Sequence, residues 1–236
     1  MPIKLLVIIP CYNEEASLPN LLDAMKNISL PGRYEMNTVV INDCSRDNTS
    51  GIAKMYNIPV IDLPINLGIG GAVQSGLIYA LRNNFDMAVQ MDGDGQHPPA
   101  ELNKLLDCQF SSGANVVIGS RFINKEGFQS SFTRRVGISF FHWLNKAFTG
   151  QRVYDSTSGF RLFDRKAISL AARYYPDEYP EPESLVYFSK AGLVIKETPV
   201  VMVARNGGQS SIRNFDSLYY CIKVTIAMIF SFIRKI

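Results

Sequence analysis

The sequence is poor in the residues that mark several protein classes. Its 236 residues include only four cysteines, two histidines and one tryptophan. The cysteines, at positions 11, 44, 108 and 221, form no CxxC pair and no zinc-ligand spacing. This disfavours a disulfide framework and a zinc site, and it indicates reduced thiols in a reducing compartment. With two histidines, a Ser-His-Asp hydrolase would have to use His97 or His142.

The chain also lacks an excess of charge of one sign. The formal charge is +3, from 24 basic and 21 acidic residues, which is too small to argue for a nucleic-acid partner. Hydrophobic residues make up 47% and charged residues 19% of the chain, so it can bury a core, and disorder is excluded. No linker rich in Pro, Gly or Ser divides the sequence, and we therefore expect a single main domain.

Long hydrophobic runs are missing as well. The run from Leu5 to Ile9 stops at Pro10, which is too short for a signal-peptide core and suits a buried strand. The C-terminal segment 216–236 is apolar, but only ten residues separate Lys223 from Arg234, whereas a membrane span needs about 20. We expect a helix that lies in the membrane interface; the alternative is a helix packed on the core or on a second copy.

The first 120 residues alternate between short apolar runs and helical patterns. This order predicts an α/β fold with a mostly parallel central sheet flanked by helices. In such sheets, ligands bind where loops leave the carboxyl ends of the strands. The predicted strands are 3–9, 38–41, 60–63, 87–91 and 116–119, and the predicted helices are 17–28, 47–56, 69–82 and 98–110. Beyond residue 120 the pattern loosens into a helix near 134–148, the segment YDSTSGFRLF, a helix after an acidic proline-rich stretch, two short strands and the final helix.

The most specific local signal follows the fourth predicted strand, in the sequence DGDGQ. Asp92 and Asp94, two residues apart among glycines, present hard oxygens to one divalent cation, Mg²⁺ or Mn²⁺, and leave room for phosphate. An EF-hand loop is excluded because its sixth and twelfth positions hold His97 and Asn103. A phosphatase-type nucleophile and simple helix capping remain as alternatives, although capping explains one carboxylate and not both.

The loops after the other strands offer further polar groups. Gly68, Gly70 and Gly71 could let backbone N–H groups approach a phosphate or ribose, but they do not form GxGxxG, so a dinucleotide-binding site is disfavoured. Asp43 could hydrogen-bond a base or ribose. Arginines follow several predicted turns and suit bidentate phosphate binding, although each alone could be a solvated surface residue. They are Arg121, Arg134, Arg135, Arg161 and Arg205.

Taken together, VIIPCYNEE, the aspartate after the second strand, NLGIGGA, MDGDGQHPP and DSTSGFRLF resemble the inverting family-2 glycosyltransferases of GT-A fold. Within these, the chain is most similar to the branch of dolichyl-phosphate mannose synthase and bacterial polyprenyl-phosphate sugar transferases. The resemblance implies one catalytic domain over residues 1–215, with a nucleotide-sugar half at 1–120 and an acceptor half at 121–215. Residues 216–236 would form the membrane-associating helix.

The resemblance also implies roles for single residues. Glu183, in the sequence EPE, falls where relatives that use hydroxyl acceptors place a catalytic carboxylate. Arg205 is expected to take part in catalysis as well as in binding phosphate, and it is open whether Arg134 or Arg135 faces the site. The donor set is Pro10, Tyr12, Glu14, Asp43, Gly70 and Asp92; the cation set is Asp92, Asp94 and Gln96; the acceptor and phosphate set is Arg121, Arg134, Arg135, Ser158 and Arg205.

The implied activity is metal-dependent transfer of a sugar from a nucleotide-sugar to a polyprenyl phosphate, on the cytoplasmic face of the membrane. Transfer to a hydroxyl of a growing glycan, with Glu183 as base, is the first alternative, because a hydroxyl must lose a proton whereas a phosphate is already ionised. A catalytically silent nucleotide-sugar-binding or membrane-docking protein is the second. The expected partners are the donor, the lipid, the membrane surface and a second copy or a small membrane protein, with no nucleic acid.

Overall fold

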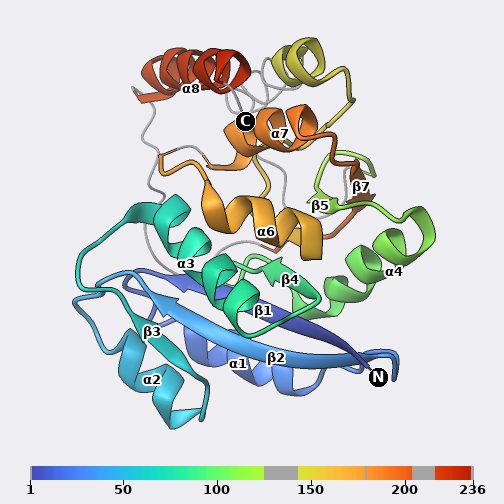
Figure 1. The fold of residues 1–236 in the computed structure, drawn as a ribbon. Helices are drawn as coiled ribbons and strands as arrows, with labels where there is room; N and C mark the ends of the chain where they lie inside the picture. The colour runs from blue at the N-terminus through green and yellow to red at the C-terminus, as the bar shows by residue number, and fades with distance from the viewer. Residues whose placement is uncertain (1, 125–142, 179, 204–215, 235–236) are drawn as a thin grey trace.

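The computed structural model describes residues 2–124, 143–178, 180–203 and 216–234. One seven-stranded sheet, in the order β3-β2-β1-β4-β6-β5-β7, takes strands from both the first and the second part of the chain (Figure 1). The strands are β1 Ile3–Cys11, β2 Tyr34–Asn42, β3 Val60–Asp62, β4 Met87–Gln90, β5 Val116–Ser120, β6 Arg161–Asp164 and β7 Ile195–Pro199. All neighbours pair in parallel except β6, which is antiparallel to β4 and β5.

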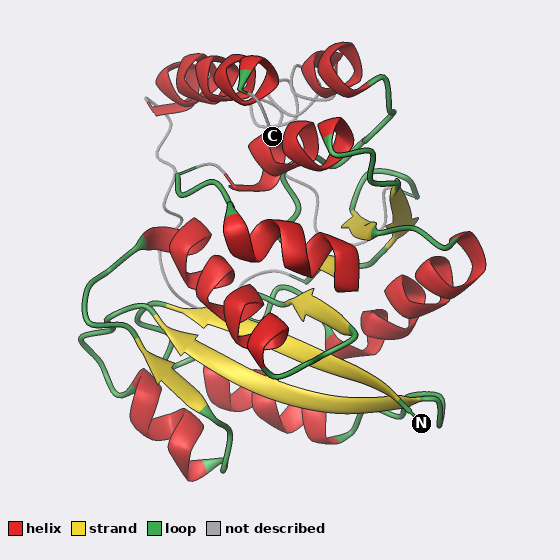
Figure 2. Cartoon of the chain, in the orientation of Figure 1, coloured by secondary structure: helices red, strands yellow, loops and turns green. Residues whose placement is uncertain are grey.

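Helices cover both faces of this sheet (Figure 2). They are α1 Leu18–Lys26, α2 Thr49–Met55, α3 Gly68–Arg82, the 3₁₀ turn η1 Pro99–Glu101, α4 Leu102–Ser112, α6 Arg165–Arg173, α7 Pro180–Lys190 and α8 Asp216–Ile233. Residues 143–149 are helical as well. One apolar core joins α1, α2 and α4 to the sheet, and the other joins α3, α6 and α7. The prediction of a mostly parallel sheet flanked by helices is therefore confirmed.

Alternation of buried residues explains how both faces of the sheet are filled. In β1, Leu5, Val7 and Ile9 enter one core, whereas Leu6 and Ile8 enter the other. Because consecutive side chains of a strand point to opposite faces, a strand covered on both sides reads as a continuous apolar run. This is the pattern from which the sequence predicts the strands.

Helix α8 lies outside these layers and packs on α7 (Figure 1). Val186 of α7 meets Val224 and Met228 of α8, together with Leu144. Lys190 of α7 donates from Nζ to the carbonyl of Phe232 (2.6 Å) and also contacts the carbonyl of Arg234, so it caps the C-terminal end of α8. Within the parts of the chain that the structure describes, no helix combines the length and the apolar character that crossing a bilayer requires.

Candidate active site

The loops after β1 and β2 are joined by hydrogen bonds at the carboxyl edge of the sheet. The N–H of Asn13 donates to Ser45 Oγ (3.0 Å), and Asn13 Oδ1 accepts from the N–H of Arg46 (2.8 Å). The N–H of Glu14 donates to Thr49 Oγ1 (2.9 Å). Because β1 and β2 are parallel neighbours, their following loops meet at one edge. The edge is thus built from both loops as one unit.

Asp43 links this unit to the loop before α3. Its Oδ1 accepts a hydrogen bond from the N–H of Leu67 (2.7 Å), and its side chain is almost fully buried. Burial raises the pKa of Asp43, and the backbone N–H groups of Leu67 and Gly68 offset part of the rise. One carboxylate oxygen of Asp43 is therefore used to hold the loop before α3. The contact of Asp43 with a base or ribose stays a prediction.

Gly70 packs closely on the backbone of a segment about 100 residues later in the chain. A Cβ at this position would overlap the backbone carbonyl oxygens of Pro176 and Asp177. Gly70 is buried where α3 packs closely on this segment. Backbone therefore occupies the space on the Cβ side of Gly70, and the approach of a phosphate or ribose to its N–H stays a prediction.

The two aspartates that follow β4 differ in exposure. The side chain of Asp92 is 32% exposed, whereas Asp94 is buried and its Oδ1 accepts from the N–H of Gln96 (3.0 Å). Gln90 donates from Nε2 to Asp92 Oδ1 (3.1 Å) and orients the exposed carboxylate. Of this pair, Asp92 is the aspartate that a ligand can reach directly.

His97 lies beneath Asp92 and is fully buried. Its Nδ1 accepts from the N–H of Asp92 (3.3 Å), and its ring stacks on Phe160 with centroids 5.1 Å apart. Burial lowers the pKa of His97, which favours the neutral ring, although the charges of Asp92 and Asp94 act in the opposite direction. His97 therefore holds the loop of Asp92 and Asp94 through a hydrogen bond to its backbone.

The segment before β6 brings a second part of the chain to Asp92. A Cβ on Gly159 would lie 2.8 Å from Asp92 Oδ2 and 2.8 Å from Gln90 Nε2. Only a residue without a side chain allows this contact. The antiparallel direction of β6 explains the approach, because its first residue, Arg161, pairs with the last residue of β4, Gln90. The predicted SGFR motif therefore packs directly against the predicted cation site.

Arg121 forms a buried ion pair with Asp155 next to this contact. Its Nε and Nη2 donate to the two carboxylate oxygens at 2.7 and 2.6 Å, and Nη2 also donates to Thr157 Oγ1 (2.9 Å). The pKa of Arg121 is raised: burial acts to lower it, but the bonds to Asp155 and the charges of Asp155, Asp92 and Glu181 outweigh that effect. Arg121 is thus within electrostatic reach of Asp92, and its contact with phosphate stays a prediction.

Ser158 and Arg161 are buried within the same segment. Ser158 Oγ accepts from the N–H of Phe160 (3.3 Å), so the hydroxyl shapes a turn. Arg161 donates to the carbonyls of Ser158 (2.7 Å) and Ser156 (2.8 Å) and to Ser184 Oγ (3.0 Å). The described geometry gives both residues a structural role, which makes Arg161 a brace between the segment and α7.

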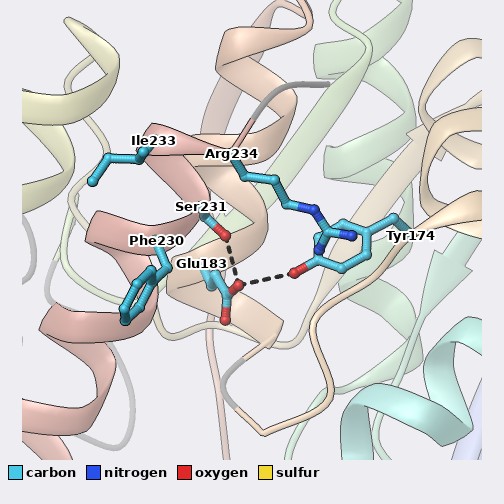
Figure 3. Close-up of a pocket in the computed structure, with 6 residues that line it drawn as sticks. All are labelled: Tyr174, Glu183, Phe230, Ser231, Ile233 and Arg234. Carbon is cyan, nitrogen blue, oxygen red and sulfur yellow. Dashed lines mark hydrogen bonds between the residues drawn. The ribbon is translucent and has the colours of Figure 1, made fainter.

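The two glutamates at the start of α7 face different surroundings. Glu183 Oε1 accepts from Ser231 Oγ (2.6 Å) and Tyr174 Oη (3.2 Å), in a cavity of about 280 Å³ beside α8 (Figure 3). Burial raises the pKa of Glu181, and the charges of Arg161, Asp92 and Arg121 act on it. Residues two apart on a helix point to nearly opposite sides. Glu183 therefore lies toward α8, whereas Glu181 is the carboxylate of EPE whose pKa responds to the charge of Asp92; the role of Glu183 as a base stays a prediction.

The remaining predicted donor residues lie on the β1 loop. Tyr12 is 44% exposed directly after β1, whereas Pro10 is buried in the strand and accepts from the N–H of Gly93 through its carbonyl (3.3 Å). The hydroxyl of Ser17 lies 3.0 Å from the carbonyl of Gly93 and also contacts the carboxylate of Glu14. These bonds place the β1 loop against the loop of Asp92 and Asp94. Arg134, Arg135 and Arg205 lie outside the described residues.

The aspartate loop fits a divalent cation that is shared with a ligand. Among the residues that the structure describes, no three acidic, histidine or cysteine side chains gather into a metal cage. Mg²⁺ in nucleotide sites is held by one or two carboxylates, with phosphate and water completing its shell. Asp92, with its exposed oxygens and with Asp94 beside it, offers this kind of donor set. Gln96 follows in the same loop, where its N–H closes the turn on Asp94.

Three residues of the site were not predicted from the sequence: Gly159, Asp155 and Glu181. Gly159 and Asp155 stand in a quoted motif, but nothing in that motif reveals their partners, Asp92 and Arg121, which lie more than 30 residues away. For Glu181 a signal existed. A helix beginning at Pro180 puts positions 181 and 183 on different faces, so only one of them could face the sheet edge.

Comparison with known proteins identifies a family. The family model described as Glycosyl transferase family 2 matches residues 6–170. The chain is 30% identical to an undecaprenyl-phosphate mannosyltransferase of Micrococcus luteus, covering 88% of this chain and 86% of that protein. It is 29% identical to a UDP-N-acetylglucosamine–dolichyl-phosphate N-acetylglucosaminyltransferase of Methanococcus voltae, covering 82% and 83%.

A solved structure shares the fold. It is glucosyl-3-phosphoglycerate synthase from Mycobacterium tuberculosis, in complex with Mn²⁺, uridine diphosphate and glucosyl-3-phosphoglycerate. The TM-score is 0.70 at 21% identity, covering 98% of this chain and 80% of that one. The similarity shows the GT-A type of fold.

Proposed function

The chain belongs to glycosyl transferase family 2, and from this premise we propose that it moves a sugar from a nucleotide-sugar to a polyprenyl phosphate. Relatives named for transfer to dolichyl or undecaprenyl phosphate support the acceptor. They cover most of this chain, including the C-terminal half. We propose further that the transfer inverts the sugar's configuration and depends on a divalent cation.

One observation carries the proposal: an accessible carboxylate, Asp92, lies at the carboxyl edge of the sheet with Arg121 and Glu181 in electrostatic range. A leaving nucleoside diphosphate gains negative charge as the glycosidic bond breaks. Fixed positive groups in a partly desolvated site stabilise that charge most effectively. A divalent ion held by Asp92 and Asp94 would supply Lewis-acid stabilisation of the diphosphate. Arg121 is held in a fixed orientation by Asp155, so its guanidinium needs no reorientation during the reaction.

The acceptor decides whether a base is needed. A lipid phosphate, with a second pKa of about 6, is largely ionised at neutral pH and attacks without losing a proton. A sugar hydroxyl must be deprotonated, and Glu181 is the residue we assign to that role. The raised pKa of Glu181, caused chiefly by burial, favours this second candidate function because it brings a carboxyl group closer to neutral pH as a proton acceptor.

We propose that the chain acts at a membrane surface through α8, on the cytoplasmic side. On the described part of this helix, Ile226, Ile229, Phe230 and Ile233 are exposed, and Arg234 follows them. Exposed apolar side chains beside a basic group are typical of helices that lie in the interface of a bilayer. Trp143 is also exposed, in the helical segment that packs beside α8.

The proposal is tested by transfer of label from UDP-, GDP- and dTDP-sugars to a short-chain polyprenyl phosphate. Assays contain Mg²⁺ or Mn²⁺, with EDTA in parallel. Label that enters the organic phase only without EDTA is the expected result, and it names the donor. Absence of lipid product with every donor, while one donor is slowly hydrolysed in the presence of cation, would replace the lipid phosphate by a hydroxyl acceptor. Absence of both reactions would contradict catalysis altogether.

Paired glutamine variants separate the two acceptor chemistries. Glu181→Gln should retain transfer to lipid phosphate within about tenfold, because no proton has to be removed. With a hydroxyl acceptor, the same variant should lose about 10²- to 10⁴-fold. Glu183→Gln serves as the matched control, since its carboxylate is bound to Ser231 and Tyr174. Equal losses in both variants, with either acceptor, would contradict the assignment of Glu181.

A further inference from the structure

Three segments that are far apart in the sequence meet beside the aspartate loop. They are the end of β5 with Arg121, the segment 153–158, and β7. Strands β5 and β7 are parallel neighbours, with Ile118 paired to Glu197. This register places Glu197 next to the point where β5 ends and the Arg121 loop begins. Glu197 has no part in the chemistry proposed above.

Glu197 binds the backbone of the middle segment with both of its oxygens. Oε2 accepts from the N–H of Tyr154 (2.6 Å), and Oε1 accepts from the N–H of Asp155 (2.8 Å). Burial raises the pKa of Glu197; the two backbone N–H groups and the hydroxyl of Ser120 offset part of the rise, while the charge of Asp155 adds to it. The carboxylate therefore fixes two consecutive peptide groups from a neighbouring strand.

Asp155 passes this constraint on to Arg121. Its Oδ2 accepts from both the backbone N–H (3.0 Å) and Nε (2.7 Å) of Arg121, and its Oδ1 accepts from Nη2 (2.6 Å). The side chain of Asp155 is fully buried and that of Arg121 nearly so. The guanidinium orientation thus follows from the position of Asp155, whose backbone is held by Glu197.

The choice of a carboxylate at position 197 is costly for stability alone. A half-buried charge loses part of its hydration, and here a second carboxylate, Asp155, lies close by. A neutral side chain could accept one N–H at a lower desolvation cost. A carboxylate is the side chain whose two oxygens both accept, so it can hold two adjacent N–H groups at once. The geometry thus uses the second acceptor oxygen that Glu has and its isostere Gln lacks.

We infer that Glu197 is a positioning residue, which sets Arg121, and the segment 153–158 that leads into Gly159, against Asp92 for transfer. The inference rests on the proposed function, because it assigns Arg121 to the leaving or accepting phosphate. The role that we assign to Glu197 is indirect. Glu197 acts through Asp155 and Arg121.

The test is Glu197→Gln, assayed for sugar transfer with the donor and acceptor that the wild-type chain uses. One of the two N–H groups then faces an amide NH₂ instead of an oxygen, and the segment shifts. A displacement of about 1 Å near reacting groups lowers rates by up to about 100-fold, so we expect kcat/KM to fall about 10- to 100-fold. Glu35→Gln, an exposed position on β2, is the matched control and should leave kcat/KM unchanged.

A double-mutant cycle distinguishes positioning from a general loss of stability. If Glu197 acts through Asp155, then Glu197→Gln should cost little in kcat/KM once Asp155→Asn is present. Additive losses in the cycle would overturn the inference. Activity is expressed per folded molecule, with folding checked by circular dichroism and thermal unfolding.

A second variant, Glu197→Asp, keeps the charge but is one methylene shorter and cannot reach both N–H groups. It should therefore lose activity as Glu197→Gln does. Wild-type kcat/KM in either folded variant, or failure of both to fold, would overturn the inference in favour of a purely structural role. An inactive wild-type chain would instead refute the proposed function, so the two failures are distinguishable.

Discussion

The carboxyl edge of the sheet and the α7–α8 end of the molecule are held together by different forces. At the edge, short polar bonds join loops from β1, β2, β4 and β5, and several of the participating groups are buried. At the other end, α8 rests on α7 through apolar contacts, the bonds of Glu183 and the cap by Lys190. Buried polar networks fix geometry, whereas apolar contacts tolerate small shifts. The edge is therefore suited to chemistry and the α8 end to attachment.

The start of α7 connects these two regions. Glu181 responds to the charges of the edge, and Glu183 bonds to the neighbours of α8. The first turn of α7 thus contributes one glutamate to each of the two regions. The following variants test how separate the two regions are, beginning with the largest expected effect.

Asp92→Asn should abolish most of the transfer activity without unfolding the chain. The variant removes the exposed negative charge that would hold the cation, and we expect a loss of at least about 100-fold in kcat. Asp107→Asn, an exposed aspartate on α4, is the control. Transfer rates are measured at saturating donor and cation. Comparable rates in the variant and the control would remove Asp92 from the chemistry.

Gly159→Ala should impair activity by about 10- to 100-fold, since the added Cβ displaces the carboxylate of Asp92. The overlap also costs about 1–3 kcal/mol of stability. Gly32→Ala, where a Cβ would meet nothing, controls for the loss of a glycine. The apparent Kd for Mn²⁺, measured in the presence of nucleoside diphosphate, should be higher in Gly159→Ala than in the wild-type chain. An unchanged Kd together with unchanged kcat would show that the Gly159 contact does not shape the site.

Gly70→Ala should act on stability and leave the chemistry intact. Alanine is favoured over glycine in a helix by about 1 kcal/mol, but overlap with the carbonyls of Pro176 and Asp177 costs about 1–3 kcal/mol. The steric cost wins on balance, and we expect a lower Tm than in the wild-type chain. Activity per folded molecule should stay within about threefold. A larger drop would mean that the joint between α3 and the segment before α7 contributes to the edge.

Glu183→Gln should have the smallest effect, and its sign should depend on pH. Both donors bind Oε1, an oxygen that glutamine retains. The pKa of Glu183 is raised, chiefly by burial, so the protonated form is favoured in the folded chain. The stability that this contributes is complete below the unfolded pKa and is lost as the pH rises through the folded pKa.

Relative to the wild-type chain, the Tm of Glu183→Gln should therefore rise with pH and level off above that pKa, by no more than about 2 °C. Thermal unfolding from acidic to mildly basic pH checks this. A Tm difference that grows as the pH falls would contradict the assigned direction.

Local patterns sufficed to predict the parallel strands and their helices. Runs such as that in β1 are apolar on both faces, so burial alone identifies them. Strand β6 was not predicted from the sequence. It has only four residues and begins with Arg161, and a search for apolar runs does not identify such a segment as a strand in the middle of the sheet. The bonds of Arg161 to two carbonyls and a serine hydroxyl explain how it is buried there.

Only those parts of the site that lie within a single loop could be predicted from the sequence. Asp92 and Asp94 stand together in the sequence, so their chemistry could be predicted from it. The pairing of Arg121 with Asp155 depends on how distant segments pack, and no local pattern encodes it. The packing of Gly70 against Pro176 and Asp177 could not be predicted, because a glycine required by packing looks the same in sequence as a glycine required by a ligand.

The position of β6 has a consequence for how the chain acquires its structure during synthesis. Strand β5 pairs only with β6 and β7 in the described sheet, and both are made later. The strands β1 to β4 can begin to assemble as soon as they emerge, because each has at least one partner among them, although the second edge of β4 also waits for β6. Residues 116–120 must wait for at least forty further residues before their edges are satisfied. Slow translation across that interval would prolong an apolar, unpaired strand, which is the stage at which nascent chains aggregate.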